Sequence, residues 1–131
     1  MRFFIIILLL FNILPVQARH LYKESEYKAY WCNQRGGQAE YVLPNKARVD
    51  CLLPDMAVEF DFAKKFHECI GQALEYSAWT KKTPACVLII EKDKDWKYVK
   101  RLRYTKQKKY PELRTFTIRQ EKLGKYYMQT H

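Results

Sequence analysis

Several common classes of functional site lack their residues in this sequence. None of the four cysteines belongs to a C-x-x-C pair, so a zinc site has little support. The three histidines are scattered, and none stands at a recognisable spacing from a serine or cysteine, which argues against Ser–His or Cys–His catalysis. The chain also lacks internal repeats and low-complexity tracts, and its 131 residues indicate one domain.

The sequence has no apolar run of the roughly 20 residues that a membrane-spanning helix needs. A shorter and nearly unbroken apolar run, Phe3 to Leu14, follows a basic start and precedes the small residues Val16 and Ala18. This pattern predicts a secretory signal peptide over residues 1–18, with an uncleaved N-terminal anchor as the alternative. We therefore expect a secreted or periplasmic mature chain, residues 19–131, without stable membrane insertion after cleavage.

Acidic residues are scarce in the last part of the chain. Residues 19–91 carry ten basic and ten acidic side chains, which cancel, whereas residues 92–131 carry thirteen basic and four acidic ones. A positive charge concentrated in this way attracts polyanions such as nucleic acid or anionic lipid. The alternative is a solvated basic tail that only keeps the protein soluble.

The number of cysteines is even, and export would place them in an oxidising compartment. One or two disulfides are expected, and four cysteines allow three pairings. Two or more of them are alternatively buried thiols of the core, where free cysteine is common. The cysteines are Cys32, Cys51, Cys69 and Cys86.

The hydrophobic pattern predicts an α/β domain with the order α-β-β-β-α-β-α-β. The first three strands form an antiparallel meander, and the fourth is a continuous apolar run typical of the central return strand of a crossover. A basic helix, an edge strand and a loose tail from Gly124 complete the chain. The expected helices lie within 19–35, 61–80 and 95–104, and the expected strands at 39–43, 47–53, 56–60, 85–90 and 113–119.

The second predicted helix carries an apolar stripe and, beside it, a polar edge. Its 3.6-residue period directs a stripe that includes Phe62 and Phe66 towards the sheet. The same period places Lys65, Gln72 and Tyr76 along one edge of that stripe.

A turn at Pro54-Asp55 predicts that Asp50 stands directly opposite Glu59, with about 5 Å between their Cβ atoms. Two like charges so close are destabilising unless a cation lies between them. Mg²⁺ or Mn²⁺ suits such an oxygen-ligand site. The alternative is a surface hairpin with scattered acidic residues.

These residues resemble a known family. Asp50, then Glu59-Phe60-Asp61, then Gln72-Ala-Leu-Glu-Tyr76 is similar to the PD-(D/E)XK nuclease superfamily, in its RecB-type branches with a Q-x-x-x-Y helix. The resemblance covers roughly residues 24–91. It implies a restriction-endonuclease-like αβββαβ core, with a mixed sheet flanked by helices, that hydrolyses phosphodiester bonds in nucleic acid, DNA being favoured over RNA. It also implies that Asp50 and Glu59 hold Mg²⁺ or Mn²⁺.

The chain departs from the family where a lysine is usual and Asp61 stands instead. Lys65 is the expected substitute, because it lies on the same helix edge as Gln72. Glu40 is expected to complete the metal shell, with Glu24 or Glu26 as alternatives. The implied catalytic set is Asp50, Glu59, Asp61, Lys65, Gln72 and Tyr76.

A basic segment follows the core and is expected to contact phosphates without sequence preference. The sequence therefore predicts an exported, metal-dependent nuclease-like protein. Two alternatives remain: a catalytically inactive relative that only binds nucleic acid, and a cationic secreted protein that binds a membrane or a partner. The expected phosphate contacts are Lys97, Lys100, Arg101 and Arg103.

Overall fold

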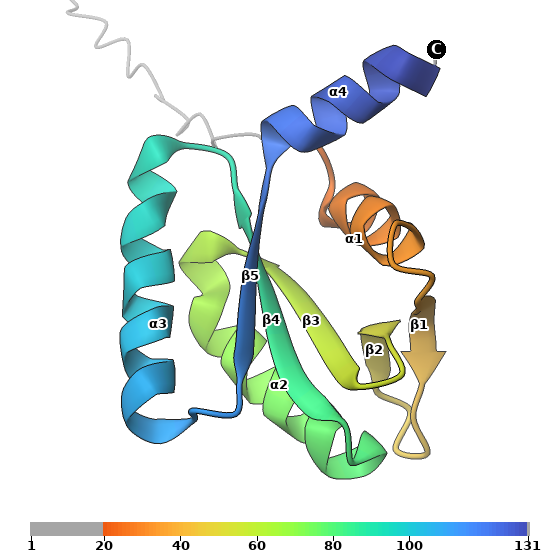
Figure 1. The fold of residues 1–131 in the computed structure, drawn as a ribbon, viewed down its shortest axis with the longest axis vertical. Helices are drawn as coiled ribbons and strands as arrows, with labels where there is room; N and C mark the ends of the chain where they lie inside the picture. Colours follow the sequence, from red (N-terminus) through yellow and green to blue (C-terminus); the bar gives the residue numbers. More distant parts are fainter. Residues whose placement is uncertain (1–19, 131) are drawn as a thin grey trace, which may run out of the picture.

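The computed structural model describes residues 20–130, so the predicted signal peptide over residues 1–18 lies outside the described residues. The chain forms a mixed α/β fold with one five-stranded sheet of order β1-β2-β3-β4-β5 (Figure 1). The elements are α1 (Glu24–Asn33), β1 (Gln38–Val42), β2 (Arg48–Leu52), β3 (Met56–Phe62), the 3₁₀ turn η1 (Ala63–Lys65), α2 (Phe66–Thr80), β4 (Thr83–Ile90), the 3₁₀ turn η2 (Asp93–Asp95), α3 (Trp96–Lys109), β5 (Arg114–Arg119) and α4 (Gln120–Thr130).

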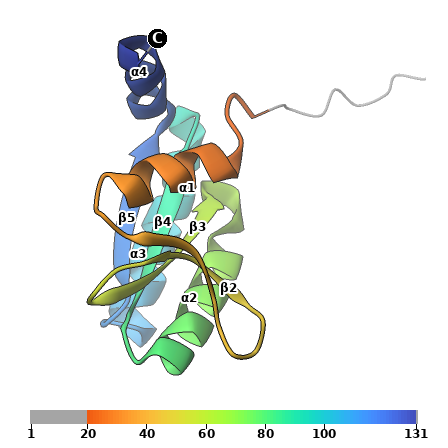
Figure 2. The ribbon, with the colours of Figure 1, turned by 90° about the vertical axis from the view of Figure 1, so that its right-hand side faces the viewer.

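The sheet joins an antiparallel meander to a parallel half. β1, β2 and β3 pair antiparallel, whereas β3, β4 and β5 pair parallel. Helices α2 and α3 connect the parallel strands and cover one face, while α1 lies on the opposite face (Figures 1 and 2). The predicted α/β class, the meander and the return strand are confirmed. Among the described residues, no helix is long and apolar enough to cross a membrane.

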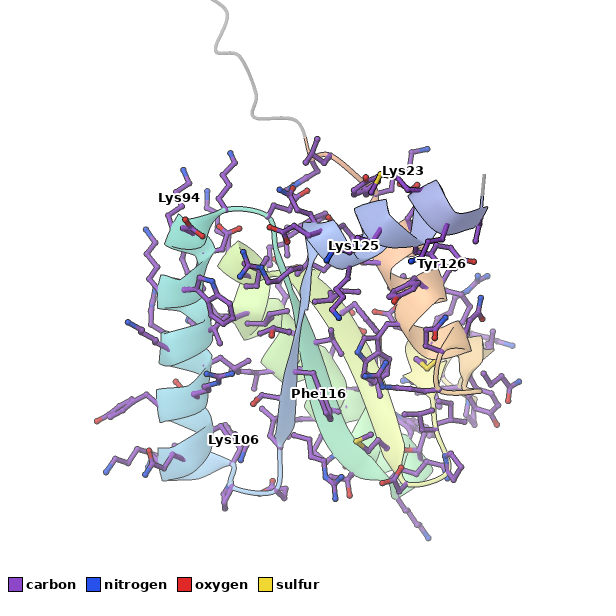
Figure 3. All side chains as sticks on the ribbon, turned by 45° about the horizontal axis from the view of Figure 1, so that its top comes forward. Lys23, Lys94, Lys106, Phe116, Lys125 and Tyr126 are labelled. Carbon is purple, nitrogen blue, oxygen red and sulfur yellow. A yellow bond between two sulfur atoms is a disulfide. The ribbon has the colours of Figure 1, made fainter. Side chains whose placement is uncertain are left out.

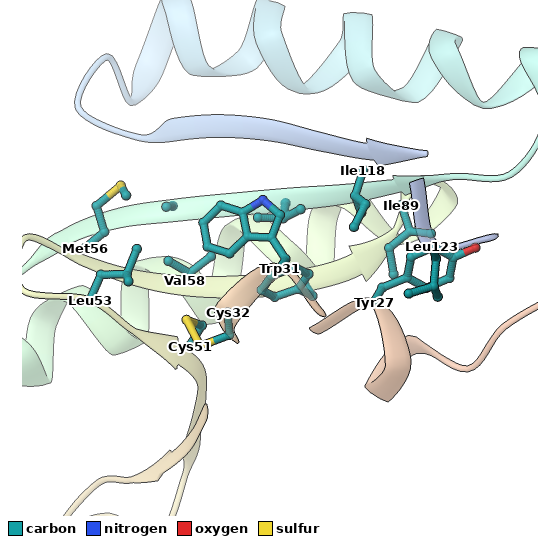
Figure 4. Packing of buried hydrophobic residues seen from close by; sticks show 13 residues of the cluster. Tyr27, Trp31, Cys32, Cys51, Leu53, Met56, Val58, Ile89, Ile118 and Leu123 are labelled. Atoms are coloured by element: carbon teal, nitrogen blue, oxygen red, sulfur yellow. A yellow bond between two sulfur atoms is a disulfide. The ribbon is translucent and has the colours of Figure 1, made fainter. Parts of the chain in front are cut away.

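Strand β4 is buried on both faces, which explains its unbroken apolar sequence. Val87 and Ile89 pack with α1 on one face, whereas Cys86 and Leu88 pack with α2 and α3 on the other. Side chains alternate along a strand, so a central strand needs an apolar residue at every position. Figure 4 shows the α1 side of this core, where Trp31 lies over the sheet.

The prediction that a helix begins at residue 61 is wrong. Strand β3 continues to Phe62, and η1 separates it from α2, which begins at Phe66. The parallel ladder between Met56–Phe62 and β4 holds these residues extended, so strand pairing overrides their helical period. Phe62 therefore contacts Tyr27 on the α1 face, while Phe66 is buried on the α2 face as predicted.

The loose tail predicted from Gly124 is also wrong, because the chain forms α4 there. Leu123 is fully buried, and the Tyr127 hydroxyl donates a hydrogen bond of 3.0 Å to Glu26 on α1. The ring of Tyr126 lies 5.0 Å from that of Tyr30 of α1. Figure 3 shows Tyr126 on the side of α4 that faces α1. Packing against α1 supplies the apolar burial that a short isolated helix lacks.

One disulfide joins α1 to the sheet, as the even cysteine count predicted. It links Cys32 of α1 to Cys51 of β2, while Cys69 and Cys86 are buried free thiols. The chain passes the bridge at Gly37, where an added Cβ would lie 2.5 Å from Cys51 Sγ. Glycine at this position therefore allows β1 to begin directly beside the bridge.

Gly71 gives a test of the helix register. It lies inside α2 with ordinary backbone angles, and an added Cβ would meet nothing within 4 Å. Gly71→Ala should raise the free energy of unfolding by about 0.5–1 kcal/mol, because alanine loses less backbone entropy. Urea denaturation measures this change.

The matched control is Gly36→Ala, at a residue that follows α1 with a φ of 62°. Alanine is strained in this left-handed region, so the same measurement should show a loss of about 1 kcal/mol. Equal effects at the two glycines would contradict the assigned backbone conformations.

Candidate functional site

A polar cleft of about 430 Å³ opens beside α2, against the first strands of the sheet. It contains the six residues predicted as catalytic, namely Asp50, Glu59, Asp61, Lys65, Gln72 and Tyr76. The other lining residues are Glu24, Ala47, Arg48, Glu68 and Glu75. The structure therefore brings together the set that the resemblance implied, although those residues come from two strands, a 3₁₀ turn and a helix.

The strand register sets the centre of this cleft. Cys51 pairs with Val58, and the next positions along the same register are Asp50 and Glu59, as the turn predicted. Here the Asp50 side chain enters the ladder, since its Oδ2 accepts a hydrogen bond of 2.9 Å from the Phe60 amide. The carboxylate of Asp50 therefore bridges β2 and β3 beside Glu59.

Three acidic residues of the cleft are nearly inaccessible, at 6% exposure for Asp50, 5% for Glu59 and 4% for Asp61. Burial, followed by the charge of Asp50, raises the pKa of Glu59 far above its ordinary value. Burial, followed by the charges of Glu24 and Glu68, raises the pKa of Asp61 to about 7. The carboxyl groups therefore resist full ionisation unless a cation joins them.

Lys28 of α1 is a member of the site that the sequence did not reveal. Its Nζ lies 2.8 Å from Asp50 Oδ1 and 2.9 Å from Glu40, with Glu24 at 3.9 Å. Burial alone would lower the pKa of Lys28, but hydrogen bonds to Asp50 and Glu40 raise it. A cation from outside the motif therefore neutralises the buried Asp50.

Glu40 reaches the site only through this lysine. Its side chain is 45% exposed, pairs with Lys28 and does not line the cleft. Its backbone has a φ of 54°, which is uncommon for a residue other than glycine. The role of Glu40 as a metal ligand stays a prediction. Glu24 lines the cleft, whereas Glu26 bonds the Lys23 amide and Tyr127.

One edge of α2 and the preceding turn complete the cleft. Lys65 of η1 lines it and, by its charge, opposes the rise in the pKa of Asp61. The Tyr76 hydroxyl donates a hydrogen bond of 3.2 Å to Gln72 Oε1. Burial, followed by the charge of Glu59, raises the pKa of Tyr76, so this phenol stays protonated. Hydrogen-bond donors therefore stand beside the acidic pair.

The cleft offers a hard divalent cation two carboxylate ligands and no larger group of ligands among the described residues. Within residues 20–130, no three or more histidine, cysteine or acidic side chains are grouped so that they could hold a metal ion. Two carboxylates do lie side by side, and the buried Glu59 Oε2 accepts no hydrogen bond from the described residues. Mg²⁺ is often held by one or two carboxylates with water and substrate phosphate. Asp50 and Glu59 would hold such an ion.

The four predicted phosphate contacts lie on α3 and outside the acidic cleft. Lys100 and Arg101 line a second groove, between the start of α2 and α3. Lys97 Nζ lies 4.9 Å from the ring centre of Tyr98, and Arg103 is exposed.

The chain matches no protein-family model, no curated protein and no solved structure. Its function is therefore inferred from the residues of the cleft.

Asp61 makes stability depend on pH. Its folded pKa of about 7 exceeds the ordinary value of 3.8, so the folded state holds its proton more tightly than the unfolded state. The contribution of Asp61 to stability is therefore full below about pH 4 and is lost as the pH rises from about 4 to about 7. Asp61→Asn should raise the free energy of unfolding by about 1–2 kcal/mol near pH 8 and leave it nearly unchanged near pH 4.

Urea denaturation at the two pH values, in metal-free buffer, checks this prediction. The control is Asp55→Asn, at an exposed turn residue, which should have little effect at either pH. Asp61 is not the source of the pH dependence if Asp61→Asn leaves the fall in stability in place.

Lys28 should matter for stability in a way that surface lysines do not. Only 16% of its side chain is exposed, and Lys28→Met leaves Asp50 buried without its cation. The expected loss is about 3 kcal/mol in the free energy of unfolding. Adding Asp50→Asn to Lys28→Met should recover part of that loss, whereas Lys23→Met, at an exposed residue before α1, should cost little. Additive losses in the double variant would mean that the two side chains do not interact.

Proposed function

We propose that the chain is an exported, metal-dependent nuclease-like protein of the PD-(D/E)XK superfamily that hydrolyses phosphodiester bonds in nucleic acid, with DNA favoured over RNA. One observation carries the proposal. Asp50 and Glu59 are buried side by side on an open cleft, and one oxygen of Glu59 has no hydrogen-bond partner among the described residues. Such an arrangement is unfavourable for the protein alone and becomes favourable when a cation is bound.

The order of elements supports the same assignment. α1, β1, β2, β3, α2 and β4 follow one another as in the αβββαβ core of that superfamily, within a mixed sheet flanked by helices. The acidic pair lies on β2 and β3, and the residues of the Q-x-x-x-Y pattern lie on α2 facing it.

The residues of the cleft would divide the work between them. Asp50 and Glu59 would hold Mg²⁺ or Mn²⁺, which when bound polarises a phosphodiester and lowers the pKa of bound water. Lys65, an exposed residue of the lining, would supply positive charge to an incoming phosphate. Gln72 and Tyr76 offer hydrogen-bonding groups to that phosphate.

A catalytically inactive relative that only binds nucleic acid is the second candidate. Lys28 favours it, because its ammonium already neutralises Asp50 and so reduces the need for a metal ion. In this case the cleft would not catalyse hydrolysis, and the basic surface would bind nucleic acid.

Glu59→Gln separates the two candidates. Mg²⁺ or Mn²⁺ should raise the melting temperature of the wild type and support nicking of supercoiled plasmid. Glu59→Gln should abolish both effects, with at least about a hundredfold loss of nicking, because it removes a charged ligand. Glu112→Gln, at an exposed residue outside the cleft, is the matched control and should behave as the wild type.

Normal nicking by Glu59→Gln would place the chemistry elsewhere. DNA binding by the wild type without a metal-dependent shift or nicking would select the inactive relative. Binding to anionic liposomes without DNA binding would select the cationic membrane-binding protein instead.

A further inference from the structure

A second groove, of about 450 Å³, runs between the start of α2 and α3. Its lining combines aromatic and basic side chains and contains no carboxylate. The residues are Phe66, His67, Lys100, Arg101, Tyr104 and Thr105. The groove is therefore the chemical opposite of the acidic cleft.

The positive charge of α3 is not balanced by acidic residues within the helix. Seven of its fourteen residues are lysine or arginine and none is acidic. Across residues 20–130, no ion pair involves a basic side chain of this helix. Some of these cations lie over rings instead, with Arg101 Cζ at 4.9 Å from the ring centre of Phe66 and Lys108 Nζ at 5.8 Å from that of Tyr104. Uncompensated charge of this density favours a polyanionic ligand.

Aromatic rings add a second property that phosphate binding alone does not need. The side chain of Tyr104 is 65% exposed, beside Lys100 and Arg101 in the same groove. In the same groove, the ring of the buried Phe66 lies tilted against that of His67, with 3.8 Å between the ring centres. Exposed rings flanked by cations are how proteins bind single strands, since bases stack on the rings while phosphates meet the cations.

Neighbouring residues at the start of α2 line the groove and the acidic cleft. Lys65 lines the cleft, and the next residue, Phe66, lines the groove. Lys64, just before them, is exposed, so basic residues continue from one site to the other. On the proposed function, this turn is where a strand held in the groove would pass towards Asp50 and Glu59.

We infer that this groove binds single-stranded nucleic acid, with phosphates on Lys100 and Arg101 and a base stacked on Tyr104. That the bound strand feeds the acidic cleft rests on the proposed function, whereas binding itself does not. A duplex keeps its bases stacked inside and would offer this groove its phosphates alone.

Binding of labelled oligothymidylate and of an abasic strand of equal length and charge tests the inference. Fluorescence anisotropy in EDTA should show about tenfold tighter binding of oligothymidylate, because only this strand can stack. Tyr104→Ala should remove that difference by weakening oligothymidylate binding about tenfold while leaving abasic binding unchanged. Arg101→Ala should weaken both strands alike and lower the slope of log affinity against log salt by about one.

Two exposed residues near β1, at the far edge of the sheet from β5, serve as controls. Tyr41→Ala on β1 and Lys46→Ala in the following turn should leave both affinities unchanged. Equal affinity for the two strands, or no effect of Tyr104→Ala, would overturn the inference. So would tighter binding to duplex DNA or to phosphatidylglycerol vesicles that does not depend on Tyr104.

This assay contains no metal and does not use Glu59, so its failure differs from failure of the proposed hydrolysis. Base-dependent binding without metal-dependent nicking would support single-strand binding in the groove and contradict the proposed nuclease activity. Nicking that needs Glu59, together with equal binding of the two strands, would support the nuclease proposal and contradict base stacking in the groove.

Discussion

The burial of acidic side chains beside one another is the constraint on which the structure of this cleft depends. Asp50 and Glu59 face each other across β2 and β3, where their burial leaves little water to screen their charges. The charge is offset by one partly buried lysine, Lys28, and by raised pKa values of Glu59 and Asp61. This partial compensation leaves an oxygen of Glu59 without a partner among the described residues, which is the observation behind the proposal of a bound cation.

The position of α1 is what delivers that lysine. Tyr27 and Trp31 bury one side of the helix against the sheet, and Lys28 lies next to this stripe. The disulfide from Cys32 ends in Cys51, the residue that follows Asp50. Packing of α1 and the disulfide therefore hold Lys28 close to Asp50. The charge balance of the cleft thus depends on the position of α1.

The two grooves beside α2 have linings of opposite charge. One side of the helix faces carboxylates on β2 and β3, while the start of the helix faces basic side chains of α3. Lys65 lines the acidic cleft, and the next residue along the chain, Phe66, lines the basic groove. A negatively charged polymer would be attracted by α3 and repelled by the cleft, unless a metal ion reverses the charge at the cleft.

The sequence by itself determined the alternation of strands and helices, the opposition of Asp50 and Glu59, and the edge of α2 that carries Gln72 and Tyr76, because short turns and side-chain periods are local properties. It could not place Lys28 in the site or predict α4, and it began α2 five residues too early. Those features depend on which surfaces pack together: α1 on the sheet, α4 on α1, and β3 on β4. Tertiary structure decided them because burial and strand pairing between distant segments outweigh local preference.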